Sequence, residues 1–575
     1  MIEFLTTDGI RVDLVPDQEV SLSLENALFS NDHIPVAWTT DVELPVSPTN
    51  SRLFGYPDAM LLTEQRREIN VTMYINAIPA MLGKLKLTGK SDGLLQASFV
   101  GVAIEDSLTG SLKDAPFNRW DFGSAPLGQR PLFDEVITGA MNNTREDFAL
   151  PLMVRESEKD TADNYVVNSQ IGAIEYESFG LKYLNSPKYN YVTPVVKLKY
   201  ILQTVFADCK IDEAYADYFG KVGIVAPYRK NASPTLEGKY NLPHEHTETE
   251  LHFILDLAEA MPDVTIADFV KNMLSAFCAT IFISRGVKMM MSNKAIIQDQ
   301  GFIDWSSKIS DDIEQEFEPG QSYEYGFSGV SDTDVTEAIT DCATIADCFN
   351  ATDDSAVRCA ATGDIYRKIQ RPYIAGHGSQ TYYLNGLDLL RQEAMIPQDT
   401  PDKSMDTFSA KSDWVPVKCI PYVFRYTLDS SMIYWHDGVM LPIIDVPPVG
   451  GSRPSTIQFG LLETNFVGPY VPSVQLTSNG CIGGSLAIFT PTLSSLNLMG
   501  TLGLYERYHK DFKEWLAKDK TVTKTAVNLT ATDIANLKIW KKVMLYNRLF
   551  FIKALAITLN TSKDYIHTEA DLVVA

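Results

Sequence analysis

The sequence contains no run of about 18 consecutive apolar residues, the length that a membrane-spanning helix requires, so we expect no membrane segment. Its first residues, MIEFLTTDGIRVDLVPDQ, carry scattered charges and lack both the basic start and the apolar core of a signal peptide. No C-x-x-C pair occurs among seven widely spaced cysteines, which indicates a reduced compartment and buried thiols. We therefore expect a soluble protein that is made in the cytoplasm.

Positive charge is also scarce, because 49 Lys and Arg stand against 73 Asp and Glu, a formal net charge of −24. Proteins that bind nucleic acid through its phosphates need clusters of Lys and Arg, so specific nucleic-acid binding is not expected. An acidic surface would instead let DNA pass without adsorbing. With 575 residues, 45% of them hydrophobic, the composition is that of a globular protein of roughly three or four domains.

The motifs of the common enzyme classes are missing. There is no G-x-S-x-G nucleophile turn, no Walker phosphate loop and no G-x-G-x-x-G. One cluster, HEHTETELH, contains residue types that bind zinc: His244, Glu245, His246, Glu248 and His252. It lacks the H-E-x-x-H order of a metalloprotease, so we favour a solvated helix start whose acids complement the helix dipole.

The cysteines and the acid pairs have simple structural interpretations. Cys342, Cys348 and Cys359 are spaced by six and eleven residues, which does not fit known zinc modules. Cys278 falls on the buried side of a predicted helix end, which favours an inert core thiol over a nucleophile. The pairs Asp311-Asp312 and Asp353-Asp354 could serve a glycosidase, although a chain with 73 acids supplies such pairs by chance.

Aromatic residues alternate along one predicted strand and could stack on sugars, but the same alternation is typical of a half-buried strand. We favour a core or interface role for this set, which comprises Tyr422, Phe424, Tyr426, Tyr434 and Trp435. We therefore expect no catalytic, cofactor-binding or metal-binding residue anywhere in the chain.

The best-formed local pattern is VTIADFVKNMLSAFCATIFISRGVKMMM, residues 264–291. Thr265 is placed as a helix N-cap, Asp268 occupies the third helical position, and Val264 and Phe269 are spaced as a hydrophobic staple. Apolar spacing then predicts one buried helical face, formed by Ile266, Phe269, Val270, Met273, Leu274 and Phe277. The runs ATIFI and VKMMM around a turn at 284–286 predict a β-hairpin.

Two strand patterns at opposite ends of the chain have the same order. Residues 69–102 predict a strand, a break at 76–79, a strand, a turn at 91–93 and a third strand. Residues 541–574 predict a strand, a two-residue turn at Asn547-Arg548, a strand, a turn and a strand. A capping pair, Thr530 and Asp533, precedes the second pattern. The match predicts two similar small β-units, one at each end of the chain.

The fold class that we expect is α+β and multi-domain. Six segments are predicted: 1–110, strand-rich; 111–190, a loop-rich connection; 191–330, an α/β insertion with the helix and hairpin; 331–440, an acidic linker and mixed region; 441–500, a Pro/Gly-rich β insertion; and 501–575, a helix followed by a β-meander.

Packing motifs near the start, middle and end of the chain occur in a familiar order. They are DVELPVSPTNSRLFGYP with MYINAIPAMLGKLKLTG, then TIADFVKNMLSAFCATIFISRGVKMMMSNK with GFIDWSSKIS and QSYEYGFSG, then GLYERYHKDFKEWL with LTATDIANLKIWKKVMLYNRLFFIKALAITL. In this order the sequence resembles the tail hub (baseplate hub) proteins of phages and prophages of Bacteroides-like bacteria. Residues 111–190 and 440–500 match nothing that we recognise.

The resemblance implies two small tail-tube-like β-barrels, formed by the N- and C-terminal regions, with an α/β insertion and a β-rich, loop-heavy insertion. Three chains would form a ring of six barrels that joins a sixfold tube to a threefold tip. The protein would then be a non-enzymatic virion component without cofactors, made in the host cytoplasm and located at the tail tip.

The partners that the resemblance implies are further copies of the chain in a trimeric ring, a tail-tube or distal-tail protein, a tip or spike protein and a tape-measure protein. Two alternatives stay open. One is a distal-tail or receptor-binding adaptor whose 420–500 region binds a glycan, and the other is a tail-associated peptidoglycan hydrolase.

Overall fold

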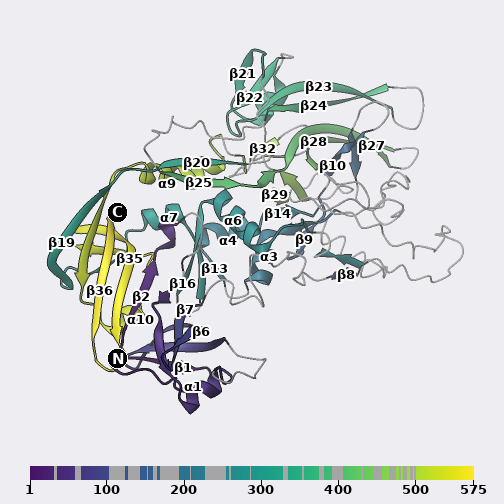
Figure 1. The fold of residues 1–575 in the computed structure, drawn as a ribbon. Coiled ribbons are helices and arrows are strands. Elements are labelled where there is room, and N and C mark those ends of the chain that lie inside the picture. Colours follow the sequence, from purple (N-terminus) through teal and green to yellow (C-terminus); the bar gives the residue numbers. More distant parts are fainter. Residues whose placement is uncertain are drawn as a thin grey trace, which may run out of the picture.

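The computed structural model describes residues 1–30, 35, 37–57, 67–102, 124–126, 143–151, 153–159, 165–168, 193–206, 209–226, 254–257, 261–284, 287–327, 335–351, 355–374, 381–391, 406–428, 432–444, 456–464, 474–477, 481–483, 489–491, 496–497 and 500–575. These residues form mostly β-sheet with short helices. Both termini lie in one part of the molecule, where the purple and yellow strands of Figure 1 meet, and the middle of the chain extends away from it. Over the described ranges, no helix has the length and apolar character needed to cross a bilayer.

The N-terminal unit is built on the predicted meander, which is confirmed. Strands β5 (Glu68–Ile75), β6 (Ile78–Ser91) and β7 (Leu94–Gly101) pair antiparallel in succession. Tight turns join them at Asn76-Ala77 and Asp92-Gly93, where all four residues adopt positive φ, the conformation that two-residue hairpin turns require. Four further strands flank the meander: β1 (Ile2–Thr6) on β5, β3 (Trp38–Thr39) and β4 (Val42–Pro45) on β7, and β2 (Glu19–Glu25) on β3.

The C-terminal unit repeats this construction. Strands β34 (Lys542–Leu545), β35 (Arg548–Asn560) and β36 (Ile566–Val574) form a second antiparallel meander. Its first turn lies at Tyr546-Asn547, one residue earlier than predicted, because these two residues carry the positive φ angles. The flanking strands are β18 (Phe302–Asp304) on β34, β33 (Lys520–Val527) on β36, and β19 (Ile309–Glu318) on β33.

The two units share one strand order. In space the N-terminal unit runs β1-β5-β6-β7-β3/β4-β2, and the C-terminal unit runs β18-β34-β35-β36-β33-β19. Both have a short helix at the same point of the sequence: α1 (Pro48–Leu53) between β4 and β5, and α10 (Ala531–Ala535) between β33 and β34. The first strands differ in direction, since β1 is antiparallel to β5 whereas β18 is parallel to β34. This common topology is what an internal duplication leaves behind.

The prediction of two β-barrels is wrong for the described strands, because no pairing closes either unit. Closure of the N-terminal unit would require β1 to pair with β2. Instead β2 pairs antiparallel with β35 of the other unit, while residues 10–12 bond along the outer edge of β1. The two units therefore merge into one open sheet of 13 strands.

The predicted helix and hairpin are confirmed at the centre of the molecule. Helix α6 (Ile266–Phe277) begins at Thr265, whose hydroxyl accepts the Asp268 N–H, and its predicted face is buried except for the half-buried Leu274. Cys278 ends the helix in the left-handed conformation. Strands β16 (Ala279–Ser284) and β17 (Val287–Ser292) then pair antiparallel, and β13 (Cys209–Ile211) adds to β17. Met290 is buried and its two methionine neighbours are half-buried.

Short helices surround this hairpin and α6. They are α3 (Leu198–Val205), α4 (Glu213–Phe219), α7 (Asn293–Gln298), a π-helical turn (Tyr505–His509) and α9 (Lys510–Leu516). Strand β20 (Ser322–Phe327) pairs in parallel with β25 (Thr407–Ser412) beside them. Among the described residues, most of the buried aromatic side chains pack into the hydrophobic core that includes these elements.

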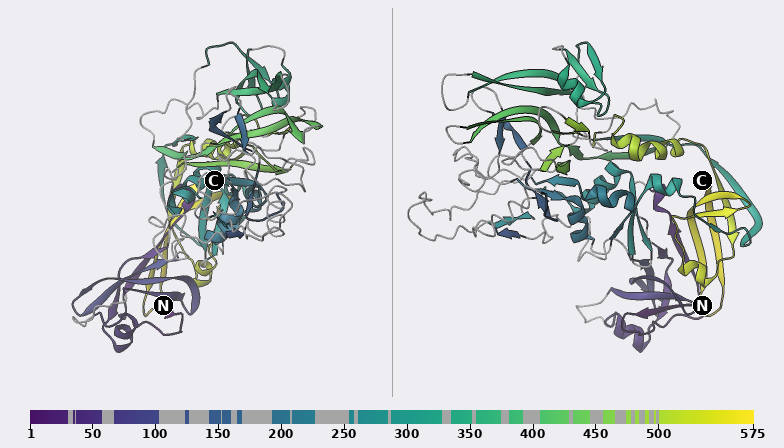
Figure 2. Two further views of the ribbon diagram at one scale, coloured as in Figure 1. Left: turned by 90° about the vertical axis from the view of Figure 1, so that its right-hand side faces the viewer. Right: turned by 180° about the vertical axis from the view of Figure 1, so that it is seen from behind.

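A sheet of eight strands and a sheet of six strands form the part of the molecule farthest from the termini (Figure 2). One has eight strands in the order β11 (Tyr165–Asn168), β10 (Met153–Lys159), β28 (Met432–Ile444), β27 (Lys418–Leu428), β24 (Thr381–Arg391), β23 (Ile365–Ile374), β22 (Ala356–Cys359) and β21 (Ile339–Cys342). The other has six: β26 (Trp414–Pro416), β29 (Ile457–Thr464), β14 (Val222–Val225), β12 (Val195–Lys197) and β9 (Phe148–Ala149), with β30 (Val474–Thr477) on β29. Small pairs complete the fold: β8 (Ser124–Pro126) with β15 (Ile254–Asp256), and β31 (Cys481–Gly483) with β32 (Phe489–Pro491).

Strand pairing links segments that are distant in sequence in these outer sheets. The six-stranded sheet brings residues 148–149 next to 195–197, and residues 222–225 next to 457–464. The six predicted segment boundaries stay predictions, because a domain boundary is defined by independent folding and not by strand order.

Candidate functional site

The two ends of the chain meet at the terminal junction, which we define as β2, β35 and residues 15–18 and 560–563. Seven residue pairs form the ladder between β2 and β35, from Glu19 opposite Asn560 to Glu25 opposite Ala554. A ladder of this length satisfies the edge that each unit would otherwise expose.

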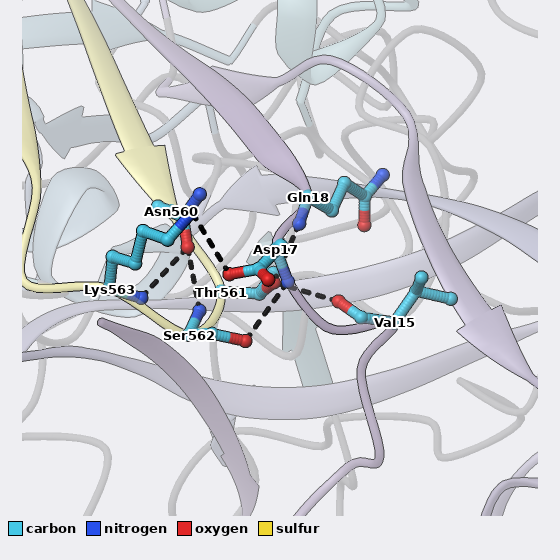
Figure 3. Close-up of polar contacts among 7 residues, drawn as sticks. All are labelled: Val15, Asp17, Gln18, Asn560, Thr561, Ser562 and Lys563. Carbon is cyan, nitrogen blue, oxygen red and sulfur yellow. Dashed lines mark hydrogen bonds and ion pairs between the residues drawn. The ribbon is translucent and has the colours of Figure 1, made fainter.

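A cluster of hydrogen bonds continues the terminal junction beyond the strand ends (Figure 3). The Gln18 N–H donates to the Thr561 hydroxyl, and the Thr561 N–H donates to the Gln18 carbonyl, each at 3.0 Å. The Thr561 hydroxyl also donates to the Val15 carbonyl at 2.7 Å, and the Asp17 N–H donates to the Ser562 hydroxyl at 2.9 Å. Asn560 shapes the turn by accepting the Ser562 and Lys563 N–H groups, both at 2.8 Å. The exposed ion pair from Lys563 to Asp17, at 3.4 Å, adds little in water.

Asn26 fixes the other end of the terminal junction. Its side chain is buried and donates to the Ile552 carbonyl at 2.7 Å and to the Ile539 carbonyl at 3.0 Å, while its oxygen accepts the Leu28 N–H at 2.9 Å. The amide therefore connects the N-terminal unit to two segments of the C-terminal unit. An apolar core with residues from both units lies beneath, with Phe4 and Leu22 from one and Leu555 from the other.

A second junction, the helix junction, surrounds the C-terminal end of α6. The last helical carbonyls have no partner within a helix, and here side chains satisfy them. His509 Nε2 bonds the Ala276 carbonyl at 3.0 Å, Tyr325 donates to the same carbonyl at 3.2 Å, and Tyr215 donates to the Phe277 carbonyl at 2.7 Å. Because Nε2 donates there, His509 Nδ1 accepts the Tyr323 hydroxyl, at 2.6 Å.

The electrostatics of the helix junction are those of a packed core. Complete burial lowers the pKa of His509 to about 3, against which its bond to Ala276 acts only weakly, so the ring is neutral at physiological pH. Cys278 is buried at the end of α6, as predicted, and this burial raises the pKa of its thiol to about 12. These groups brace α6 and the hairpin against the π-helical turn that precedes α9.

In the described part of the chain, the 13-stranded sheet ends in an open strand edge, which is the outer edge of β19. Strand β19 is the last strand of the path, and its other edge has no partner among the described strands. Its side chains from Asp312 to Phe317 are exposed, Phe317 by 80%, and Figure 2 shows the strand curving along the outside of the terminal units. An open strand edge of ten residues is a template for pairing with another chain.

The structure describes only some of the residues that the sequence singles out. The histidine cluster at residues 244–252 and the pair Asp353-Asp354 lie outside the described residues. Asp312 lies on the exposed strand β19, and the five aromatic residues lie on β27 and β28, which pair with each other.

The cysteines of the acidic segment are placed in a way that their spacing did not reveal. Cys342, Cys348 and Cys359 come together because β21 and β22 pair in parallel with α8 (Ile345–Asn350) between them. Over the described ranges, no group of His, Cys, Asp and Glu side chains has the arrangement of a metal site.

Comparisons with known proteins give distant likenesses only. No protein-family model matches the chain, and neither does any curated protein. Among solved structures, it is similar to the 43 kDa tail protein of prophage MuSo2 from Shewanella oneidensis, with 6% identity and a TM-score of 0.31 over 100% of this chain and 98% of that one. It is also similar to the tail protein from Neisseria meningitidis MC58, with 9% identity and a TM-score of 0.27 over 100% and 95% of the two chains. At these scores the likeness assigns neither fold nor function.

Proposed function

We propose that this protein is a structural component of a phage tail, namely the hub that nucleates the tail tube and joins it to the tip. The observation that carries the proposal is the repeated strand order of the two terminal units. It agrees with the sequence resemblance to tail hub proteins, which implies two related β-units per chain. The protein acts through its shape in this account, as a virion protein of the tail tip without catalysis or a cofactor.

A chain with two equivalent units suits the change of symmetry at a tail tip. Three chains in a closed ring present six units to a sixfold tube and one threefold surface to the tip. Closed rings are the ordinary outcome of head-to-tail contacts between identical chains. The ring partners are further copies of this chain, and the tube or distal-tail protein, the tip or spike protein and the tape-measure protein are its neighbours along the axis.

The join between units within a chain suggests the join between chains. Strand β2 is the outer strand of the first unit. It pairs with the part of β35 that follows Phe550, because β35 pairs with β34 only up to that residue. Strand β19 is the outer strand of the second unit, and β6 is the counterpart of β35. Residues 88–91 of β6 continue past the segment that pairs with β5. In the ring, β19 of one chain therefore lies along β6 of the next.

Charge complementarity supports this contact. Strand β19 exposes Asp312 and Glu314, while Glu316 beside them pairs with Lys524 of its own chain at 2.7 Å; strand β6 exposes Lys86 and Lys90. Opposite charges on adjacent strands stabilise pairing, and like charges destabilise it. The acidic balance of the whole chain also suits a ring through which DNA passes, because a negative lumen does not retain phosphates.

Reversal of these charges tests the proposed contact. Glu314→Lys and Lys90→Glu should each weaken the trimer, and three contacts at about 1 kcal/mol each correspond to a loss of association on the order of 100-fold. The double variant should recover the trimer, since each contact then has its two charges exchanged. Asp263→Lys, on an exposed loop before α6, makes a matched charge change away from the contact and should have no effect.

Sedimentation velocity measures these states. Equal association of the wild type, both single variants and the Asp263→Lys control would refute the β19–β6 contact. A monomeric wild type that clears cell-wall substrate would favour the tail-associated hydrolase in place of a hub.

A further inference from the structure

Three cysteines from a segment of 18 residues meet at β21 and β22, the last two strands of the eight-stranded sheet, which lie at the top of Figure 1. Cys342 and Cys359 end the parallel strands β21 and β22 and lie directly opposite one another. Neighbouring strands are about 4.8 Å apart, which falls within the Cα separations that disulfides span. Cys348 lies on α8, which packs on both strands, and its thiol is within hydrogen-bonding reach of both other sulfur atoms.

The three thiols have different surroundings. Cys348 and Cys359 are fully buried, whereas Cys342 is half-buried and can meet a small reagent. A hydrogen bond from Cys348 lowers the pKa of Cys359, and the Thr362 hydroxyl and the N–H groups of Thr362 and Ala361 add to this effect. The same bond raises the pKa of Cys348, which keeps its proton.

The turn after β22 explains why the Cys359 thiolate is stabilised. The Gly363 N–H donates to the Cys359 carbonyl at 2.7 Å, and Gly363 has a φ of +78°, so the chain folds back tightly over the cysteine. The N–H groups of the turn consequently point at its sulfur, and such donors favour a thiolate. The cluster thus combines an accessible thiol, a protonated thiol in contact with it, and a third thiol whose thiolate form the turn stabilises. The buried Asp364 faces the same turn, where burial and then the charge of Cys359 raise the pKa of its carboxyl to about 7.

We propose that Cys342, Cys348 and Cys359 form a thiol–disulfide exchange site, in which a low-molecular-weight disulfide oxidises Cys342 and Cys348 to a disulfide. The Cys342 thiolate first attacks one sulfur of the reagent, RSSR, so that a mixed disulfide forms and RS⁻ leaves. Cys348 then passes its proton to the first RS⁻, and its thiolate attacks Cys342 Sγ, so that the second RS⁻ leaves. The leaving thiolates take up the two protons, so two protein thiols are oxidised and one RSSR is reduced to two RSH.

The disulfide ties α8 to the end of β21, and Cys359 is the positioning residue that holds the Cys348 thiol by a hydrogen bond until it reacts. In a reducing cytoplasm the thiols stay reduced, whereas outside the cell a disulfide at this point would persist. The proposal rests on the geometry of the cluster and is independent of the assignment as a tail hub.

The test uses the full-length reduced protein and oxidised glutathione, with peptide mapping by mass spectrometry under non-reducing conditions. A Cys342–Cys348 cross-link should form at least about tenfold faster than glutathionylation of Cys209, which is a half-buried thiol without a thiol neighbour among the described residues. Cys342→Ser should abolish the cross-link, and Cys209→Ser should leave its rate unchanged.

Cys359→Ser separates a positioning role from a structural one. Because the hydrogen bond to Cys359 raises the pKa of Cys348, this replacement should speed the second step by about tenfold or more near neutral pH, and the gain should shrink as the pH rises and wild-type Cys348 ionises more readily. A stable mixed disulfide on wild-type Cys342, a reaction of Cys342 no faster than that of Cys209, or an unchanged rate in Cys359→Ser would each overturn the proposal.

Discussion

Replacement of Asn26 by alanine should open the terminal junction, because this one side chain satisfies three backbone groups. It bonds the Leu28 N–H and the carbonyls of Ile539 and Ile552 in a buried position. Each lost bond to a buried group costs about 1 kcal/mol, so Asn26→Ala should destabilise the junction by about 3 kcal/mol. That free energy corresponds to a roughly 100-fold larger population of the locally opened state.

Native-state hydrogen exchange followed by mass spectrometry measures this opening directly. Peptides that cover β2 and β35 should lose about 100-fold in protection in Asn26→Ala, while peptides from β23 and β24 in the outer sheet keep theirs. Asn528→Ala is the matched control, since Asn528 is exposed and its replacement should change protection by less than about twofold, in keeping with a surface substitution. Equal protection of β2 and β35 in the two variants would refute the view that Asn26 holds the units together.

Three further predictions concern the elements around the junctions. Gly83→Ala should destabilise the N-terminal unit by about 2 kcal/mol, because the new Cβ would lie 2.3 Å from the Val100 carbonyl oxygen. Gly89→Ala in the same strand should be tolerated, because its Cβ meets only the flexible end of Gln96 at 3.2 Å. Urea unfolding of the two variants compares their stabilities. Thr265→Ala should lower the stability of α6 by about 1 kcal/mol through loss of its cap, measured by exchange in residues 266–270, and unchanged protection there would contradict it. The pKa of His509 is about 3 in the folded protein and near 6.5 in the unfolded chain, so the protein takes up a proton on unfolding at pH values between these two. Stability should therefore fall as the pH drops from 6.5 towards 3. A thermal midpoint with the same pH dependence in His509→Gln would exclude this cause.

Local patterns predict the parts of this fold that local chemistry determines. The cap at Thr265 and the apolar spacing of α6 act within one helix, and the meander turns depend on single residues with positive φ. The C-terminal turn differs from its prediction by one residue because Tyr546 takes the left-handed conformation that the sequence favours for asparagine.

The wrong part of the prediction concerns pairing over long distances. Strand β2 is compatible with β1 or with β35 by pattern alone, and pairing with β35 spans more than 500 residues. The choice depends on which edges stay open after the units form, and no local pattern records that.

The thiol cluster could not be predicted from the sequence for a related reason. Spacings of six and eleven residues exclude zinc modules, but a parallel pair of strands with a helix between them brings such residues together irrespective of spacing. Only the register of β21 and β22 places Cys342 opposite Cys359.

Symmetry of the assembled particle tests the central proposal most directly. Class averages of the purified full-length protein by negative-stain electron microscopy should contain closed rings of three chains, with six similar lobes that correspond to the two units of each chain. Rings with true sixfold symmetry would favour the distal-tail alternative, and particles that stay monomeric at micromolar concentration would contradict the hub.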